Sequence, residues 1–160
     1  MPIDIAVIEF DRKLVRGTFI KTLHGKSIYV KERSAFAPGD DIIVLGFPRG
    51  LSDRTHNLAL MRNALIASPY GINFRGEPEF LVDANLHPGM SGSPVMTKPR
   101  TMIPIEKGGV SIYQTPVSSF LGVFSATLSW GKEALGLGEV WYADLIEEII
   151  EGMKLSPEEE

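Results

Sequence analysis

Apolar residues occur in short runs that alternate with polar residues, and glycine and proline separate the runs. This pattern predicts many short strands, because helices would place apolar residues at a 3.6-residue period over longer blocks. Closely spaced strands are typical of an antiparallel barrel or sandwich. We therefore predict an all-β fold with strands at Ile3–Phe10, Thr18–Leu23, Ser27–Val30, Asp41–Phe47, Leu58–Ala67, Phe80–Asp83, Ser93–Met96, Leu121–Leu128 and Glu139–Tyr142.

One helical pattern follows these strands. Asp144 can cap its start and Gly152 can end it. Its apolar face would consist of Leu145, Ile146, Ile149, Ile150 and Met153. The segment Thr97–Ser119 is rich in proline, lysine, glycine and serine, so we expect a long surface excursion or a hairpin there. The remaining residues, 156–160, would form a disordered acidic tail behind a single domain over residues 1–155.

Composition narrows the classes of function. The 160 residues are 44% hydrophobic and 22% charged, as in an ordinary folded domain. A net charge of -4 disfavours nucleic acid as a partner. The absence of cysteine excludes disulfides, cysteine-ligated metals and a cysteine nucleophile. No apolar run approaches the roughly 20 residues that span a bilayer, and the acidic N-terminus does not resemble a signal peptide. The sequence does not indicate whether the protein resides in the cytoplasm or the periplasm.

One loop carries the elements of a nucleophilic site. Two glycines flank Ser91 in the run Pro88-Gly89-Met90-Ser91-Gly92-Ser93-Pro94, between two apolar strands. Glycine tolerates positive φ, which lets neighbouring N–H groups converge on one point while the serine side chain is presented there. Acyl transfer needs this arrangement, a hydroxyl nucleophile beside donors that stabilise an oxyanion. Taken alone, the loop is weak evidence, and a simple Pro-Gly turn explains it better.

The wider sequence adds specificity. The loop follows Asp83-Ala84, and further characteristic segments are Pro38-Gly39-Asp40-Asp41-Ile42-Ile43-Val44-Leu45-Gly46-Phe47-Pro48, Leu121-Gly122-Val123-Phe124-Ser125 and Gly138–Tyr142 with its helix. In this order they resemble the chymotrypsin-fold (trypsin-like) serine proteases, and among them the bacterial HtrA-like type. Only Arg12–Lys31 and Thr97–Ser119 lack clear counterparts. The resemblance implies a chymotrypsin-like antiparallel β-barrel, the C-terminal barrel of a two-barrel protease, with a C-terminal α-helix.

The resemblance also implies catalytic roles. Ser91 would be the nucleophile, and the oxyanion hole would lie along Gly89, Met90 and Ser91. The segment Asp4-Ile5-Ala6-Val7-Ile8 resembles the family strand that begins with the triad aspartate, so Asp4 would take that role. Met90 stands where the family has Asn or Asp, and Ser93 replaces a second glycine. Met90 cannot supply the polar support that the family residue gives.

Substrate contacts follow by the same resemblance. Asn85 would lie near the base of the pocket for the residue before the scissile bond, and its neutral side chain disfavours Arg or Lys there. Ser125, Ala126 and Thr127 would line the cleft and pair with the substrate backbone as an added strand. His87 would also line the cleft. The implied substrate is therefore a protein or peptide, and neither a cofactor nor a metal is implied.

The resemblance does not identify a general base for Ser91 within this chain. A serine needs a histidine to take its proton, and in the chymotrypsin order that histidine precedes the aspartate. The triad histidine would then lie upstream of Met1. Of the histidines in the chain, His87 is a weak candidate for the base, whereas His24 and His56 fall in expected surface turns. Their spacing matches no metal-ligand motif.

Other serine hydrolases fit less well. An α/β-hydrolase needs a histidine after Ser91 and a helix there, but no histidine follows and Pro94 disfavours a helix. The subtilisin order could be formed by Asp4, either His24 or His56, and Ser91, yet the β-rich pattern does not supply its α/β scaffold.

We expect a partial protease domain, mainly the second barrel, that lacks the N-terminal barrel of its parent protein. The alternatives are a natural protein that keeps the barrel as a non-catalytic peptide-binding module, and an unrelated β-barrel in which the Ser91 loop is only a turn. An exposed half-cleft would also suit a homodimer.

Overall fold

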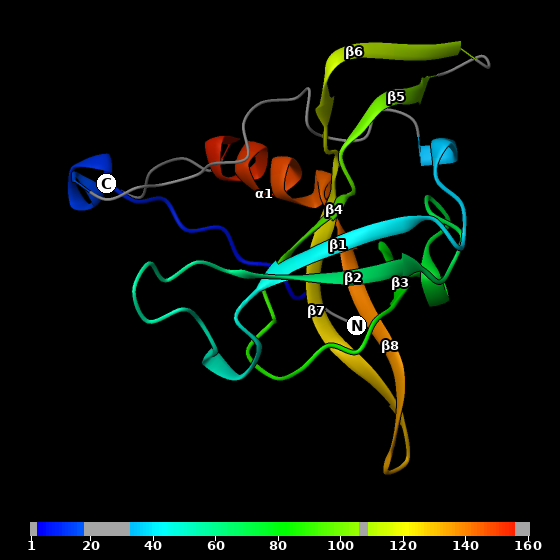
Figure 1. Ribbon diagram of the computed structural model, residues 1–160, viewed down its shortest axis with the longest axis horizontal. Coiled ribbons are helices and arrows are strands. Elements are labelled where there is room, and N and C mark those ends of the chain that lie inside the picture. The colour runs from blue at the N-terminus through cyan, green and yellow to red at the C-terminus, as the bar shows by residue number, and fades with distance from the viewer. Residues whose placement is uncertain (1–2, 18–32, 106–108, 156–160) are drawn as a thin grey trace.

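The fold is a closed antiparallel β-barrel, seen in a computed structural model that describes residues 3–17, 33–105 and 109–155 (Figure 1). The strand order around the barrel is β1-β2-β3-β8-β7-β4, and β4 pairs with β1 to close it. The six strands are β1 Asp41–Gly46, β2 Leu60–Ile66, β3 Glu79–Asp83, β4 Pro94–Thr97, β7 Phe120–Trp130 and β8 Glu133–Tyr142. The predicted all-β barrel is confirmed.

Alternation along the strands separates two apolar clusters. In β1, Ile42 and Val44 point into the barrel, whereas Ile43 points outward, because successive strand residues face opposite sides. The interior is filled mainly by Ala64, Ile66, Phe80, Val82, Met90, Val95, Leu121, Phe124, Val140 and Tyr142. Outside the barrel, Ile43 packs with Met96, Phe120, Ala143 and Ile146. Ile146 belongs to α1, Asp144–Leu155, so this second cluster joins the helix to the barrel.

The predicted hairpin between β4 and β7 is present. Strands β5, Arg100–Ile105, and β6, Gly109–Val117, form a separate two-stranded sheet that projects from the barrel (Figure 1). No helix in the described part of the chain is long and apolar enough to cross a membrane.

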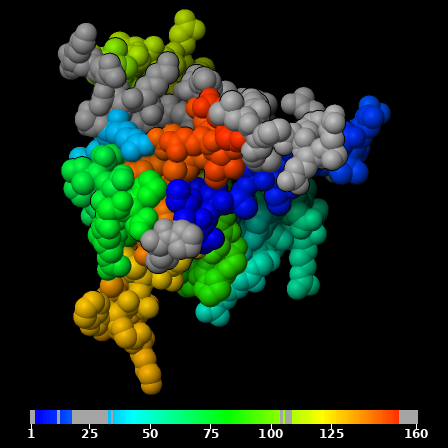
Figure 2. Space-filling view, turned by 180° about the vertical axis from the view of Figure 1, so that it is seen from behind, coloured from blue at the N-terminus to red at the C-terminus, as the bar shows by residue number. Residues whose placement is uncertain are grey.

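The N-terminal segment differs from the prediction. Residues 3–10 have no regular secondary structure, and 3-10 turns occur at Arg12–Val15, Arg33–Ala35, Pro48–Gly50 and Phe74–Gly76. Each barrel strand already has two neighbours, so the closed barrel offers no free edge to residues 3–10. They cross its surface below α1, with the side chain of Ile8 82% exposed (Figure 2). The expected strands at Thr18–Leu23 and Ser27–Val30 and the expected tail lie outside the described residues.

The predicted helix is also present, but it begins and ends differently. Asp144 is its first residue rather than a preceding cap, and the helix passes Gly152 to reach Leu155. A glycine within a helix costs only about 1 kcal/mol, so tertiary packing of the apolar face outweighs it.

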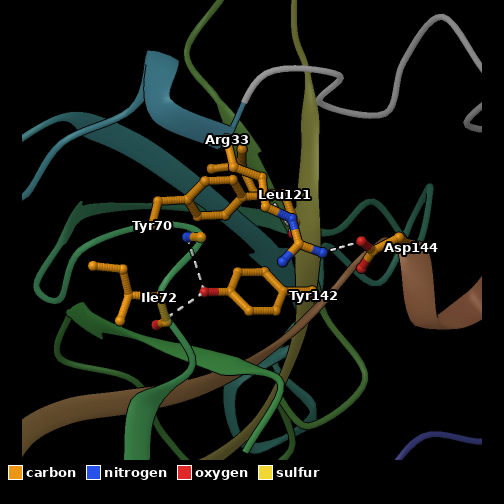
Figure 3. Close-up of polar contacts among 7 residues, drawn as sticks. Arg33, Tyr70, Ile72, Leu121, Tyr142 and Asp144 are labelled. Carbon is orange, nitrogen blue, oxygen red and sulfur yellow. Dashed lines mark hydrogen bonds and ion pairs between the residues drawn. The ribbon is translucent and has the colours of Figure 1, made fainter. Parts of the chain in front are cut away.

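A polar and aromatic cluster fixes the start of α1 (Figure 3). Arg33 lies 4.2 Å above the centre of the Tyr142 ring and forms an ion pair with Asp144. The Tyr142 hydroxyl accepts a hydrogen bond from the Gly71 N–H and donates one to the Ile72 carbonyl. These contacts join two loops to the beginning of the helix.

Candidate functional site

Ser91 lies in the loop between β3 and β4, and the loop presents its side chain to solvent. Gly89 and Gly92 on either side have φ of +90° and +84°, in the region where glycine carries no steric penalty. The Gly92 N–H donates to the Phe124 carbonyl at 2.8 Å, and the Phe124 N–H donates to the Ser93 carbonyl at 2.9 Å. This loop, residues 84–93, is therefore held against β7; it is called the nucleophile loop below, after the role expected for Ser91.

Hydrogen bonding within this loop leaves two particular amides open. The Met90 N–H donates to the His87 carbonyl at 3.3 Å, and the Ser93 N–H donates to the Met90 carbonyl at 3.0 Å. The N–H groups of Gly89 and Ser91 have no acceptor among the described residues. Two donors beside an exposed hydroxyl could stabilise a developing oxyanion. Of the three residues expected to form an oxyanion hole, Met90 has its amide engaged in the turn.

The two residues that depart from the pattern of the resembled proteases, Met90 and Ser93, are both buried. The Met90 side chain is fully buried inside the barrel, and Ser93 is buried as well. Both lie against Gly46 of β1, where a Cβ would come within 3.3 Å of Met90 Cε and still closer to the Ser93 hydroxyl. Burial of Met90, rather than a polar side chain, anchors the nucleophile loop at this point.

Asp4 and Ser91 meet at one residue of β7. The Ser91 hydroxyl donates to the Ser125 carbonyl at 2.6 Å, and the Ser125 hydroxyl donates to the Asp4 carboxylate at 2.8 Å. Asp4 therefore reaches the nucleophile loop although its segment forms no strand. The next two β7 residues, Ala126 and Thr127, are exposed beside Ser125 and lie where the register of β7 and β8 shifts.

The histidines are placed less favourably for catalysis. His56 Nδ1 lies 2.8 Å from an Asp53 carboxylate oxygen, an interaction that lowers the pKa of Asp53. His87 is half-buried. Neither of these two histidines hydrogen-bonds to Ser91 in the described structure, and His24 lies outside the described residues.

A basic pocket adjoins the nucleophile loop, and sequence reasoning missed it. The cavity has a volume of about 660 Å³ and is lined by Pro48, Arg49, Gly50, Leu51, Ser52, Arg54, Leu60, Arg62 and His87. Asn85 is exposed and is not among the lining residues, but its carbonyl accepts a hydrogen bond from Arg62 at 2.7 Å. The sequence signal that could have indicated this pocket is the occurrence of Arg49, Arg54 and Arg62 within one loop and the following strand of a chain whose net charge is negative.

Within the described ranges, no three histidine, aspartate or glutamate side chains are grouped so that they could hold a metal ion. No family profile matches the chain, and no curated protein is significantly similar to it. The functional argument therefore depends on the site itself.

Proposed function

We propose that this barrel carries the nucleophile side of a serine endopeptidase site and that Ser91 forms an acyl-enzyme with protein or peptide substrates. The observation that carries the proposal is the pair of open amides at Gly89 and Ser91 beside an exposed hydroxyl. An oxyanion held there would accept two hydrogen bonds, and loss of one such donor typically lowers kcat by about 10²–10³.

In the proposed reaction, Ser91 Oγ attacks the carbonyl carbon of the scissile bond and its proton passes to an imidazole. The carbonyl oxygen becomes negative and accepts hydrogen bonds from the Gly89 and Ser91 amides. The imidazolium then protonates the leaving amine, and water later hydrolyses the ester. The imidazole would come from outside the described residues and lie between Asp4 and Ser91, where the Asp4 carboxylate could orient it.

The second candidate is a peptide-binding module that does not catalyse. The Ser91 hydroxyl donates to the Ser125 carbonyl, so this hydroxyl is not paired with a base. Peptide would pair with the Ser125–Thr127 segment, in which Ala126 and Thr127 are exposed, as an added strand. The expected homodimer stays a prediction that the molar mass in solution would test.

Labelling with a fluorophosphonate, read by intact mass, tests the proposal. Native protein that includes the segment supplying the imidazole should gain one adduct, and Ser91→Ala in the same protein should gain none. Ser129→Ala removes another exposed hydroxyl of the same barrel and should label as the native protein does. Absence of an adduct on native protein would overturn the endopeptidase proposal, and peptide binding unchanged by Ser91→Ala would then support the second candidate.

A further inference from the structure

The basic pocket and the nucleophile loop form one packed unit. The Arg49 N–H donates to the Pro88 carbonyl at 2.7 Å. A Cβ on Gly89 would lie 3.0 Å from the Phe47 carbonyl oxygen and 3.1 Å from the Arg49 nitrogen. The loop between β1 and β2, residues 47–59, carries Arg49 and Arg54 and is called the arginine-bearing loop below. Its backbone therefore packs directly against Gly89, whose amide is one of the two proposed oxyanion donors. A group bound in the pocket would lie beside the loop that carries Ser91.

The arginines of the pocket lack carboxylate partners in the described structure. Arg62 donates to a backbone carbonyl, and neither Arg49 nor Arg54 forms an ion pair with a described residue. The nearest carboxylate in sequence is Asp53, which already accepts hydrogen bonds from the backbone of His56 and Leu58 and from the His56 ring. The pocket therefore presents arginine side chains that have no ion-pair partner among the described residues.

The backbone at Arg49 is itself unusual. Arg49 has φ of +54°, a left-handed conformation that few residues with a side chain adopt. Such strain persists where the surrounding structure imposes it, and it occurs often at binding sites. Leu51 and Leu60 supply apolar wall beside the charge, which suits the methylene groups of a charged side chain.

We propose that this pocket binds an anionic side chain of a peptide, either the carboxylate of Asp or Glu or the phosphate of phosphoserine. Its position relative to the scissile bond depends on the proposed function. Ser125, Ala126 and Thr127 contribute nothing to the pocket lining, whereas His87 of the nucleophile loop lines the pocket, and Gly89 of the same loop packs against the backbone of Arg49. A peptide with its acyl part along β7 would therefore place a leaving-group residue in the pocket.

Peptide binding tests this proposal without depending on catalysis. The probes are three fluorescein-labelled decapeptides of alanine and valine that differ at one central residue, which is Glu, phosphoserine or Gln. Charge-assisted hydrogen bonds should make an anionic peptide bind about tenfold more tightly than the Gln peptide. This preference should shrink as ionic strength rises, because the arginines are open to solvent.

Two arginine variants and a matched control locate the effect. Arg49→Gln and Arg54→Gln should each lower the preference for anionic peptide at least about threefold. Arg75→Gln is the control, because Arg75 is exposed and has a φ of +55° in a similar turn outside the pocket. It should leave the preference unchanged.

Each outcome bears on the proposal. Equal affinity for the Glu, phosphoserine and Gln peptides, no binding of any peptide, or a preference that survives both pocket variants would overturn it. Tighter binding of the phosphoserine than the Glu peptide supports it and identifies phosphate as the preferred group. If the protein prefers anionic peptides but fluorophosphonate does not label it, the pocket proposal stands and the endopeptidase proposal fails. If fluorophosphonate labels the protein but no anionic preference is found, the endopeptidase proposal stands and the pocket proposal fails.

Discussion

The contact between Gly89 and the arginine-bearing loop makes a quantitative prediction for Gly89→Ala. Alanine at positive φ costs about 1–2 kcal/mol, and its lower entropy in the unfolded chain returns about 0.4–1 kcal/mol. The new Cβ would also lie 3.0 Å from the Phe47 carbonyl oxygen and 3.1 Å from the Arg49 nitrogen, both backbone atoms. Overpacking of this kind adds about 1–3 kcal/mol. We expect a total loss of about 1–5 kcal/mol, with a central value of about 3 kcal/mol.

Alanine substitutions at Gly92 and Gly76 separate the backbone cost of positive φ from the cost of overpacking. Their φ values are +84° and +83°, and a Cβ at either position would meet nothing within 4 Å. Alanine there should therefore cost only the backbone term, about 1 kcal/mol or less.

Urea denaturation followed by circular dichroism measures these differences. With a slope of roughly 2 kcal/mol/M, Gly89→Ala should lower the midpoint about 1 M more than Gly92→Ala does. Under the proposed function, fluorophosphonate labelling should fall with Gly89→Ala as well, because the shift would move the amide proposed to stabilise the oxyanion. If the two variants unfold at the same urea concentration, the loops are not in the close contact described here and the reasoning fails.

Three further predictions use the barrel itself. Met90→Ala should destabilise the protein by about 2–5 kcal/mol in the same assay because it empties core volume, whereas Met61→Ala, at a residue 64% exposed, should change stability by less than about 0.5 kcal/mol. Gly122→Ala should prevent stable folding, judged by thermal unfolding, because its Cβ would overlap the Trp141 carbonyl of β8; a normal melting temperature would contradict the β7–β8 register. Burial, and then neighbouring acidic residues, raise the pKa of Glu79 to about 7, so the folded protein keeps a proton that the unfolded chain releases above its ordinary value of 4.5. The free energy of unfolding should therefore fall by about 1–2 kcal/mol, after allowance for solvent screening, as pH rises from about 4.5 to 7, and Glu79→Gln should remove that slope.

The parts that local pattern determines were predictable from the sequence. The predicted strand Asp41–Phe47 agrees with β1 except for one additional residue at its end. The agreement is close because an apolar run and a flanking turn are local signals in the sequence. The loop around Ser91 was also recognised locally, since the glycines that adopt positive φ flank the serine.

Features that depend on tertiary pairing were not predictable. Ile3–Phe10 alternates like a strand, yet the closed barrel leaves no edge for it to join. The basic pocket needs Arg49, Arg54 and Arg62 to meet His87 across two loops, and their spacing in the sequence does not indicate this. Asp4 was expected as part of a strand, but its carboxylate reaches Ser125 from an irregular segment.

Closure of the barrel through β1 and β4 has a consequence for how this surface can be modified. The arginine-bearing loop leaves the end of β1, and the nucleophile loop enters the start of β4, where Val44 pairs with Val95. Hydrogen bonds between these strands hold the bases of both loops in a fixed relation. Residues 51–58, which lie between the buried Pro48 and β2, could therefore be exchanged in length and charge while Ser91 keeps its place. The barrel is therefore a scaffold on which the proposed ligand preference could be changed independently of the loop that carries Ser91.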